Sequence, residues 1–258
     1  MPTVSNIFYF SHGADNISRP PVVFIHGAGG THLHWSPQTR RIPNYRVYAL
    51  DLPAHGKSAG LGSQHIGEYA RAVINFLDAL KLNAAVMIGH SMGGGIALSL
   101  ALDFPKRVLG LGLIGTGARL RVDPRMLEST SRAETFPAAV QLINDLEFGV
   151  SVSPRLKELA RQRMSEMRPA VLHGDFLACD EFDVTNRLNE ISAPTLILCG
   201  AQDQLTPPKY SEQLHTQIQN SRLAIVPQAG HMVMLEQPEL FTQSAAEFLD
   251  TIPYRAGQ

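Results

Sequence analysis

The sequence lacks several features that would place it in a specialised class of protein. It has only two cysteines, Cys179 and Cys199, which is too few for the disulfide framework of a small secreted domain. Cys199 lies in an apolar run and is expected to be an inert buried thiol. No apolar stretch approaches the roughly 20 residues that a membrane-spanning helix requires. The formal net charge is −1, so no charge excess points to nucleic acid or an anionic membrane as a partner.

The N-terminal segment also lacks the pattern of a secretion signal. Residues 1–10 contain no basic residue ahead of an apolar core and no small-residue cleavage site. The sequence therefore predicts a soluble, cytoplasmic protein. Its 258 residues are 44% hydrophobic and 17% charged, a composition and length with which a chain can bury one large core.

Short apolar runs alternate with helical patterns along most of the chain. Each run is almost continuous in apolar residues and is bounded by glycine or proline, which is typical of a strand buried on both faces of a parallel sheet. The runs are residues 22–25, 45–50, 84–88, 108–114, 195–199 and 223–226. Helical patterns occupy residues 66–80, 94–102, 208–217 and 238–249. This alternation predicts an α/β fold with a doubly wound, mostly parallel sheet flanked by helices, whose functional residues gather at the carboxyl ends of the strands.

The alternation breaks once, between Thr116 and about Glu190. Four segments that begin with proline predict helices joined by short connections; they are residues 124–131, 137–148, 154–167 and 169–179. The simplest interpretation is a helical cap, residues 117–190, that is inserted after one strand and covers the strand ends. Residues 1–116 and 191–258 then form the α/β core.

One turn carries the strongest functional signal in the chain. Residues 89–93 read Gly-His-Ser-Met-Gly and lie between a predicted strand and a predicted helix. The pattern G-x-S-x-G needs small residues around the serine, because the turn is so tight that bulky neighbours would collide with the adjacent strand or helix. The turn would expose the hydroxyl of Ser91 at the tip of the sheet, which makes Ser91 the predicted nucleophile.

A serine hydroxyl needs a base to take its proton, and the base needs an acid that orients it. His231 is the predicted base, because it follows a glycine in the loop after a predicted strand. Asp203 is the predicted acid, because it lies in the loop after the preceding predicted strand. Asp51 competes for the role of the acid, but it follows a strand that precedes the serine. More distant alternatives are Asp180 and Asp183, and local structural roles are expected for His26, His55 and His90 among the ten histidines.

The predicted nucleophile also requires an oxyanion hole. Attack on an ester carbonyl creates an oxyanion, and losing one backbone N–H donor to it typically costs about 3 kcal/mol. One predicted donor is the N–H of Met92, directly after Ser91 at a helix N-terminus. The other is expected from residues 26–30, His-Gly-Ala-Gly-Gly, with Ala28 as the candidate. A phosphate-binding role for this loop is disfavoured, because no Walker-type or dinucleotide-binding pattern is present.

Together, five ordered motifs resemble the α/β-hydrolase superfamily; they are residues 26–30, 51–58, 89–94, 200–203 and 230–231. The resemblance covers nearly the whole chain outside the predicted cap. It implies a Ser-His-Asp hydrolase with a lid after strand six, and the order Ser91, Asp203, His231 is the one these enzymes use. Within the superfamily the chain is most similar to small bacterial esterases, near the carrier-protein methyl esterases and the meta-cleavage-product hydrolases. One departure is Ala54, where the family often has glycine.

The resemblance narrows the reaction without fixing it. Relatives that form alkyl-enzyme esters use aspartate at the elbow, so Ser91 disfavours a haloalkane dehalogenase or an epoxide hydrolase. The predicted function is a carboxylesterase for small to medium acyl chains that needs no metal or organic cofactor. Open alternatives are a C–C bond or lactone hydrolase, a cofactor-free haloperoxidase and a non-catalytic ligand-binding protein.

Several side chains are candidates for the substrate pocket, with core packing as the competing interpretation. They are Trp35, Met232 and Val233 from the core, and Phe136, Phe148 and Phe176 from the predicted cap. The cap also carries a basic cluster, Arg119, Arg121, Arg125 and Arg132, that could attract an acidic carrier protein or a carboxylated substrate. Solvated surface charge is the competing interpretation there. Monomer and homodimer both remain open.

Overall fold

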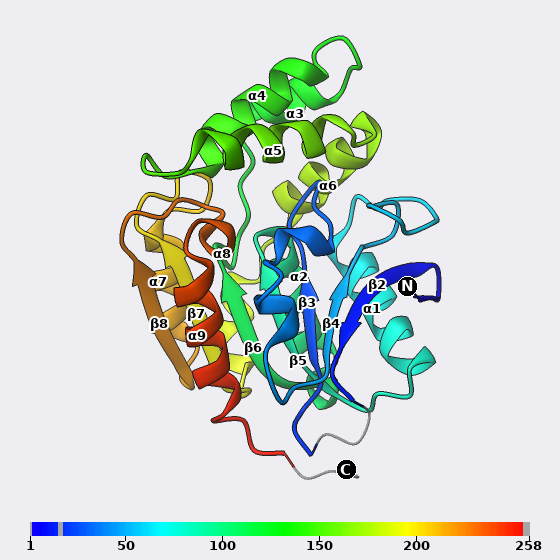
Figure 1. The fold of residues 1–258 in the computed structure, drawn as a ribbon, viewed down its shortest axis with the longest axis vertical. Coiled ribbons are helices and arrows are strands. Elements are labelled where there is room, and N and C mark those ends of the chain that lie inside the picture. The colour runs from blue at the N-terminus through cyan, green and yellow to red at the C-terminus, as the bar shows by residue number, and fades with distance from the viewer. Residues whose placement is uncertain (1, 15–17, 255–258) are drawn as a thin grey trace.

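The computed structural model describes residues 2–14 and 18–254 and is built around one eight-stranded sheet (Figure 1). The strand order is β1-β2-β4-β3-β5-β6-β7-β8. Strands β3 to β8 run parallel, and β1 and β2 add antiparallel pairs at one edge. The strands are β1 (Thr3–Val4), β2 (Ile7–His12), β3 (Val22–Ile25), β4 (Val47–Leu50), β5 (Ala85–His90), β6 (Val108–Ile114), β7 (Thr195–Gly200) and β8 (Ser221–Val226).

The predicted fold class is confirmed, and each of the six predicted runs is a strand. The bounds of β3 and β6 agree with the sequence prediction, and the other four differ by one or two residues at one or both ends. The sequence analysis did not predict β1 and β2. β2 is buried at its start but exposed at its end, so it lacks the continuous apolar run by which the central strands were found.

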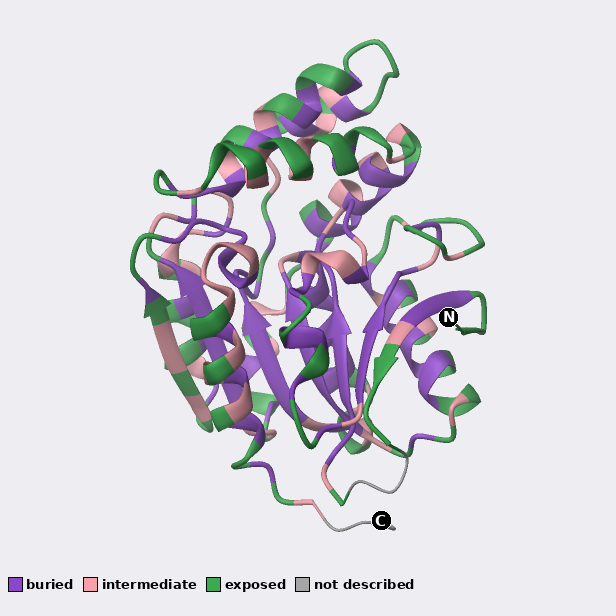
Figure 2. Cartoon of the chain, viewed as in Figure 1, coloured by how far each residue is buried: buried purple, intermediate pink, exposed green. Residues whose placement is uncertain are grey.

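Helices cover both faces of the sheet, and neighbouring residues of one strand serve opposite faces. Val23 and Ile25 pack into a cluster with helices α1 and α2, whereas Val22 and Phe24 pack into a second cluster with α9. This alternation follows from the two-residue period of a strand, and Figure 2 shows the central strands buried. The core helices are α1 (Ile66–Ala79), α2 (Met92–Asp103), α7 (Pro208–Gln217), α8 (Val233–Glu236) and α9 (Pro238–Leu249).

Four further helices lie between β6 and β7 in the chain and stand above the carboxyl ends of the strands (Figure 1). They are α3 (Pro124–Thr130), α4 (Phe136–Glu147), α5 (Pro154–Ser165) and α6 (Pro169–Glu181). Their inner faces form a third apolar cluster around Val140 and Ile143, but Ala178 and Cys179 of α6 belong to a core cluster. The division into a core and a cap at residues 117–190 therefore stays a prediction. We refer to α3–α6 as the cap helices.

Short 3₁₀ helices complete the described elements; they are η1 (His32–His34), η2 (Thr39–Arg41), η3 (Pro105–Arg107) and η4 (Thr185–Glu190). Both cysteines are buried and free, and the buried position of Cys199 agrees with the sequence prediction. Among the helices of the described residues, none is long and apolar enough to cross a membrane.

Candidate active site

Ser91 sits in a strained turn between β5 and α2. Its backbone has φ 53° and ψ −118°, a conformation that L-residues rarely adopt and that costs about 1–3 kcal/mol. The flanking glycines make the turn possible. A Cβ on Gly89 would meet the oxygen of Gly93 at 2.0 Å, and one on Gly93 would meet the oxygen of Ile25 at 2.2 Å. Only glycine fits at either position, which is the physical content of the G-x-S-x-G pattern.

Asp203 and His231 come together from the loops after β7 and β8. His231 Nδ1 lies 2.9 Å from Asp203 Oδ2, and both side chains are buried. Thr206 Oγ1 donates to Asp203 Oδ2 at 2.9 Å and lies 3.1 Å from His231 Nδ1. The amides of Leu205 and Thr206 donate to Asp203 Oδ1 at 2.9 and 2.8 Å. The carboxylate is thus held by several donors, and it fixes the orientation of the imidazole ring.

The two groups shift each other's pKa in the direction that a base and its orienting acid require. Burial by itself would lower the pKa of His231, but the adjacent Asp203 carboxylate, together with the charges of Glu147 and Glu236, outweighs burial and raises it. Burial would raise the pKa of Asp203, but the charge and hydrogen bond of His231, with those of Thr206, lower it. Asp203 is therefore ionised at neutral pH, and His231 is a stronger base than a free imidazole.

A cavity of about 350 Å³ brings Ser91 and His231 together beneath the cap helices. Ala28, His34 and Glu147 also line it, with side chains of α3, α5 and α6. The hydrogen bonds of the described residues join His231 to Asp203 and include none between His231 and Ser91. Such hydrogen bonds are often long or poorly aligned without substrate.

The predicted oxyanion loop lies directly against Ser91. A Cβ on Gly27 would meet Ser91 Cβ at 3.1 Å, and the next residue, Ala28, lines the cavity. Met92 follows Ser91 as the first residue of α2, with its side chain fully buried. Both predicted N–H donors thus belong to segments that flank the serine. Their role as an oxyanion hole stays a prediction.

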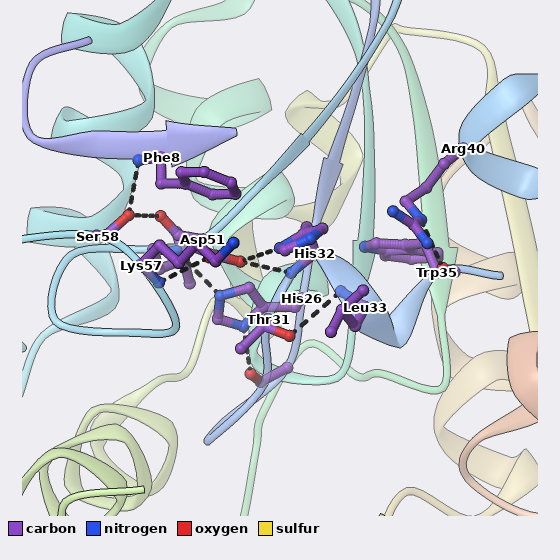
Figure 3. Close-up of polar contacts among 12 residues, drawn as sticks. Phe8, His26, Thr31, His32, Leu33, Trp35, Arg40, Asp51, Lys57 and Ser58 are labelled. Atoms are coloured by element: carbon purple, nitrogen blue, oxygen red, sulfur yellow. Dashed lines mark hydrogen bonds and ion pairs between the residues drawn. The ribbon is translucent and has the colours of Figure 1, made fainter. Parts of the chain in front are cut away.

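Asp51, the competing acid, serves the loop between β3 and η1 instead (Figure 3). Its Oδ1 accepts from the amide of His32 and contacts His32 Nδ1, both at 2.7 Å, and its Oδ2 accepts from the amide of Lys57 at 2.9 Å. Asp51 and His32 are buried, and the side-chain hydrogen bonds of Asp51 join it to His32 and Lys57, with none to His231 among the described residues. Asp51 therefore shapes the loops that carry residues 26–34 and 51–58.

His26 and His90 are locked in neutral, structural hydrogen bonds. The amide of Leu52 donates to His26 Nε2 at 3.0 Å, so His26 Nδ1 carries the proton and donates to the oxygen of Gly27 at 2.7 Å. His90 Nε2 lies 3.0 Å from the oxygen of His231. Burial holds the pKa of both rings well below the ordinary value, and this agrees with the structural roles expected from the sequence.

Asp175, on cap helix α6, ties the cap to the loops around the site. Its Oδ2 accepts from the amide of Gly29 at 2.9 Å and lies 2.8 Å from His55 Nε2. Its Oδ1 accepts from the hydroxyl of Tyr69 at 2.6 Å. Burial would lower the pKa of His55, but the Asp175 carboxylate outweighs burial and raises it. Sequence reasoning missed Asp175, which reads as an ordinary acid in a helix.

The pocket candidates divide into three groups. Phe176 lines the catalytic cavity. Trp35 and Met232 line a neighbouring cavity, also of about 350 Å³. Phe136, Phe148 and Val233 line neither cavity and lie in apolar clusters, because the apolar faces of α4 and α8 pack inward against other helices. Residues that the sequence analysis missed, His34, Glu147 and Met164, line both cavities.

Two members of the basic cluster line the catalytic cavity, Arg121 and Arg125. Arg125 is paired with Asp123 at 2.6 Å, and Arg119 with Asp183 at 3.3 Å, both in exposed positions. These acids partly neutralise the cluster, which weakens it as an anion attractor.

The arrangement of Ser91, His231 and Asp203 on this sheet defines a class, the α/β hydrolases. Residues 20–238 match the family described as alpha/beta hydrolase fold, and the chain belongs to that family. It is 27% identical to a pimeloyl-[acyl-carrier protein] methyl ester esterase of Pectobacterium carotovorum, over 95% of this chain and 99% of the relative. It is 29% identical to a 2-hydroxy-6-oxo-6-phenylhexa-2,4-dienoate hydrolase of Burkholderia cepacia, over 88% and 87%. A solved thermophilic esterase is 34% identical, with a TM-score of 0.81, over 95% of this chain and 98% of the esterase.

Proposed function

We propose that the protein is a serine carboxylesterase that cleaves esters of small to medium acyl chains. The observation that carries the proposal is the cavity in which Ser91, held in a strained turn, and the Asp203-bound His231 both lie. The similarity to esterases supports it, and the small size of the cavity, about 350 Å³, favours short to medium chains.

In the proposed reaction, His231 takes the proton of Ser91 as the hydroxyl attacks the ester carbonyl. The N–H groups of Ala28 and Met92 bind the oxyanion that forms. His231 then protonates the leaving alcohol, and afterwards it activates a water molecule that releases the acid. Asp203 stays ionised and stabilises the imidazolium at each step.

The proposal is tested by hydrolysis of p-nitrophenyl esters from acetate to decanoate, with the wild type and Ser91→Ala in parallel. We expect turnover by the wild type and a fall of several orders of magnitude in the variant. A fluorophosphonate should label the wild type at Ser91 and leave the variant unlabelled. Labelling without ester turnover would contradict the esterase assignment while keeping a reactive serine.

The same triad could cleave a C–C bond or a lactone, and one relative is named as a hydrolase of a dienoate. An enzyme of that kind would be inactive across the ester series and active on a ring-cleavage product or lactone. A protein that only binds its ligand would show neither activity. Attraction of an acidic carrier protein or a carboxylated substrate is also part of the proposal, because Arg121 and Arg125 line the cavity. Equal salt responses for charged and neutral esters would refute it.

A further inference from the structure

Glu147 is the last residue of α4 and is buried beside the loop of the proposed base. It is only 6% exposed, although glutamate is almost never fully buried without a partner. Its main-chain oxygen accepts from the amides of His231 and Met232 at 2.8 and 3.2 Å. The position of Glu147 is therefore fixed relative to His231 by the backbone, and its side chain is not needed for this attachment.

A second glutamate nearby, Glu236, provides a comparison, because its carboxylate accepts hydrogen bonds from the backbone. Glu236 accepts from the amide of Gly149 at 2.8 Å and from the amide of Gly230 at 2.9 Å. In contrast, no hydrogen bond from any described residue reaches the carboxyl group of Glu147, although the charge of His231 favours its ionised form. Burying a carboxyl group without a partner costs free energy. A carboxyl group in such a place that accepts no hydrogen bond needs an explanation, and a donor on a ligand in the cavities that it lines would supply one.

Glu147 lies between the two neighbouring cavities. Together with His34 and Met164, it lines both the catalytic cavity and its neighbour. The first cavity contains Ser91 and His231, and apolar side chains such as Trp35 and Leu156 dominate the lining of the second. A substrate whose carbonyl lies at Ser91 and whose chain extends toward the second cavity would pass Glu147.

The chemistry at this junction favours a hydrogen-bond donor on the ligand. Burial raises the pKa of Glu147 to about 7 and lowers that of His34 to about 4, so His34 is neutral at neutral pH. A carboxyl group offers an acceptor oxygen whether or not it is ionised. An N–H group of the ligand can therefore bind Glu147 in either state, while an apolar chain would leave the carboxyl group unpartnered.

We propose that Glu147 determines specificity, by accepting a hydrogen bond from an N–H group that the substrate carries close to its ester. The group is an amide N–H or an ammonium. This inference rests on the proposed esterase function, because it places the ester carbonyl at Ser91.

The test uses pairs of esters that differ in one group. N-acetylglycine ethyl ester and ethyl levulinate differ only by N–H against CH₂ on the acyl side. Acetamidoethyl butyrate and its ketone counterpart make the same exchange on the alcohol side. A third pair, β-alanine methyl ester and methyl butyrate, exchanges an ammonium for a methyl group. We expect the wild type to prefer the N–H member of at least one pair by roughly tenfold in kcat/KM, as for a hydrogen bond to a buried acceptor.

Variants then assign the preference to the carboxyl group. Glu147→Leu, which removes the acceptor at similar volume, should bring the ratio within the preferred pair to about one. Glu147→Gln keeps an acceptor oxygen but no charge, so it should retain an amide preference and lose an ammonium preference. Met164→Leu changes the lining shared by both cavities without touching the carboxyl group, and it should keep the wild-type ratio.

The outcomes separate the recognition role from the esterase function. Equal turnover of both members in every pair by the wild type would overturn the role of Glu147 and leave the esterase function standing. A preference that survives in Glu147→Leu would also overturn it. A merely structural role would slow both members of a pair equally and leave their ratio unchanged. If the wild type hydrolysed no ester at all, the proposed function would fail and this inference would fall with it.

Discussion

Asp175 offers the sharpest test of how the cap helices support the site. Its buried carboxylate accepts hydrogen bonds from Gly29 and Tyr69 and pairs with His55. Asp175→Ala would leave these partners buried and unpaired. Removing one partner of a buried charged pair costs about 3–5 kcal/mol, which for a protein of this size lowers Tm by roughly 10 °C. We expect that shift in thermal unfolding and a matching loss in urea unfolding.

Asp175→Asn separates charge from hydrogen bonding. The amide oxygen can still accept from Gly29, and its NH₂ group can donate to the hydroxyl of Tyr69, which then acts as acceptor. We therefore expect a smaller loss of about 1–2 kcal/mol. Because Gly29 adjoins Ala28, a loosened loop should lower kcat more than it raises KM in the ester assay.

Glu181 provides a matched control on the same helix. It pairs with His65 at 2.6 Å, but both side chains are more than half exposed. An exposed pair of this kind contributes about 0–1 kcal/mol, so Glu181→Ala should unfold close to the wild type and keep its kcat. If Asp175→Ala were as stable as Glu181→Ala, the reasoning that the cap is held to the loops by Asp175 would be refuted.

Two further predictions concern the base and a strained turn. Asp203 raises the pKa of His231 above its ordinary value of 6.5, so kcat/KM should fall as the pH drops through a midpoint above that value. In Asp203→Asn the midpoint should move to lower pH. An unchanged midpoint would contradict the assignment of Asp203 as the acid that orients His231. Ala54 has φ 71°, so Ala54→Gly should stabilise the protein by about 0.5–1 kcal/mol in urea unfolding, whereas Ala70→Gly within α1 should destabilise it by a similar amount. If Ala54→Gly were destabilised, packing of the methyl group would contribute more free energy than the backbone strain at Ala54 costs.

The sheet and the candidate residues at its strand ends could be predicted from the sequence because local patterns determine where they lie. A strand buried on both faces must be apolar at every position, so β3 and β6 stood out with their observed bounds. Ser91 was readable because the steric limits at Gly89 and Gly93 leave a sequence signature. Asp203 and His231 were readable because parallel strands bring their following loops to one edge. That the two make a hydrogen bond needed the structure.

Asp175 and Glu147 could not be predicted from the sequence, because their environment depends on the position of the cap helices. Asp175 and Asp180 are acids on the same helix, yet one is buried and the other exposed, and no periodicity in α6 distinguishes them. Glu147 ends an amphipathic helix, where a charged residue normally faces water. Phe136 and Phe148 were proposed as pocket residues but line neither cavity. Aromatic residues at helical spacing predict the inner face of a helix, but they do not show whether that face contacts substrate or other helices.

Asp175 and Glu147 both connect the cap helices to loops that take part in the proposed mechanism. The cap contacts the loop of Ala28 through Asp175 of α6, and it contacts the loop of His231 through the backbone of Glu147 at the end of α4. The two loops carry the proposed oxyanion donor and the proposed base. A rigid placement of the cap therefore holds both groups toward Ser91, and a displaced cap would release both together. In the proposed mechanism the cap helices thus support the catalytic geometry and also cover the cavity. Substitutions at their contacts should then affect turnover even where they touch no substrate.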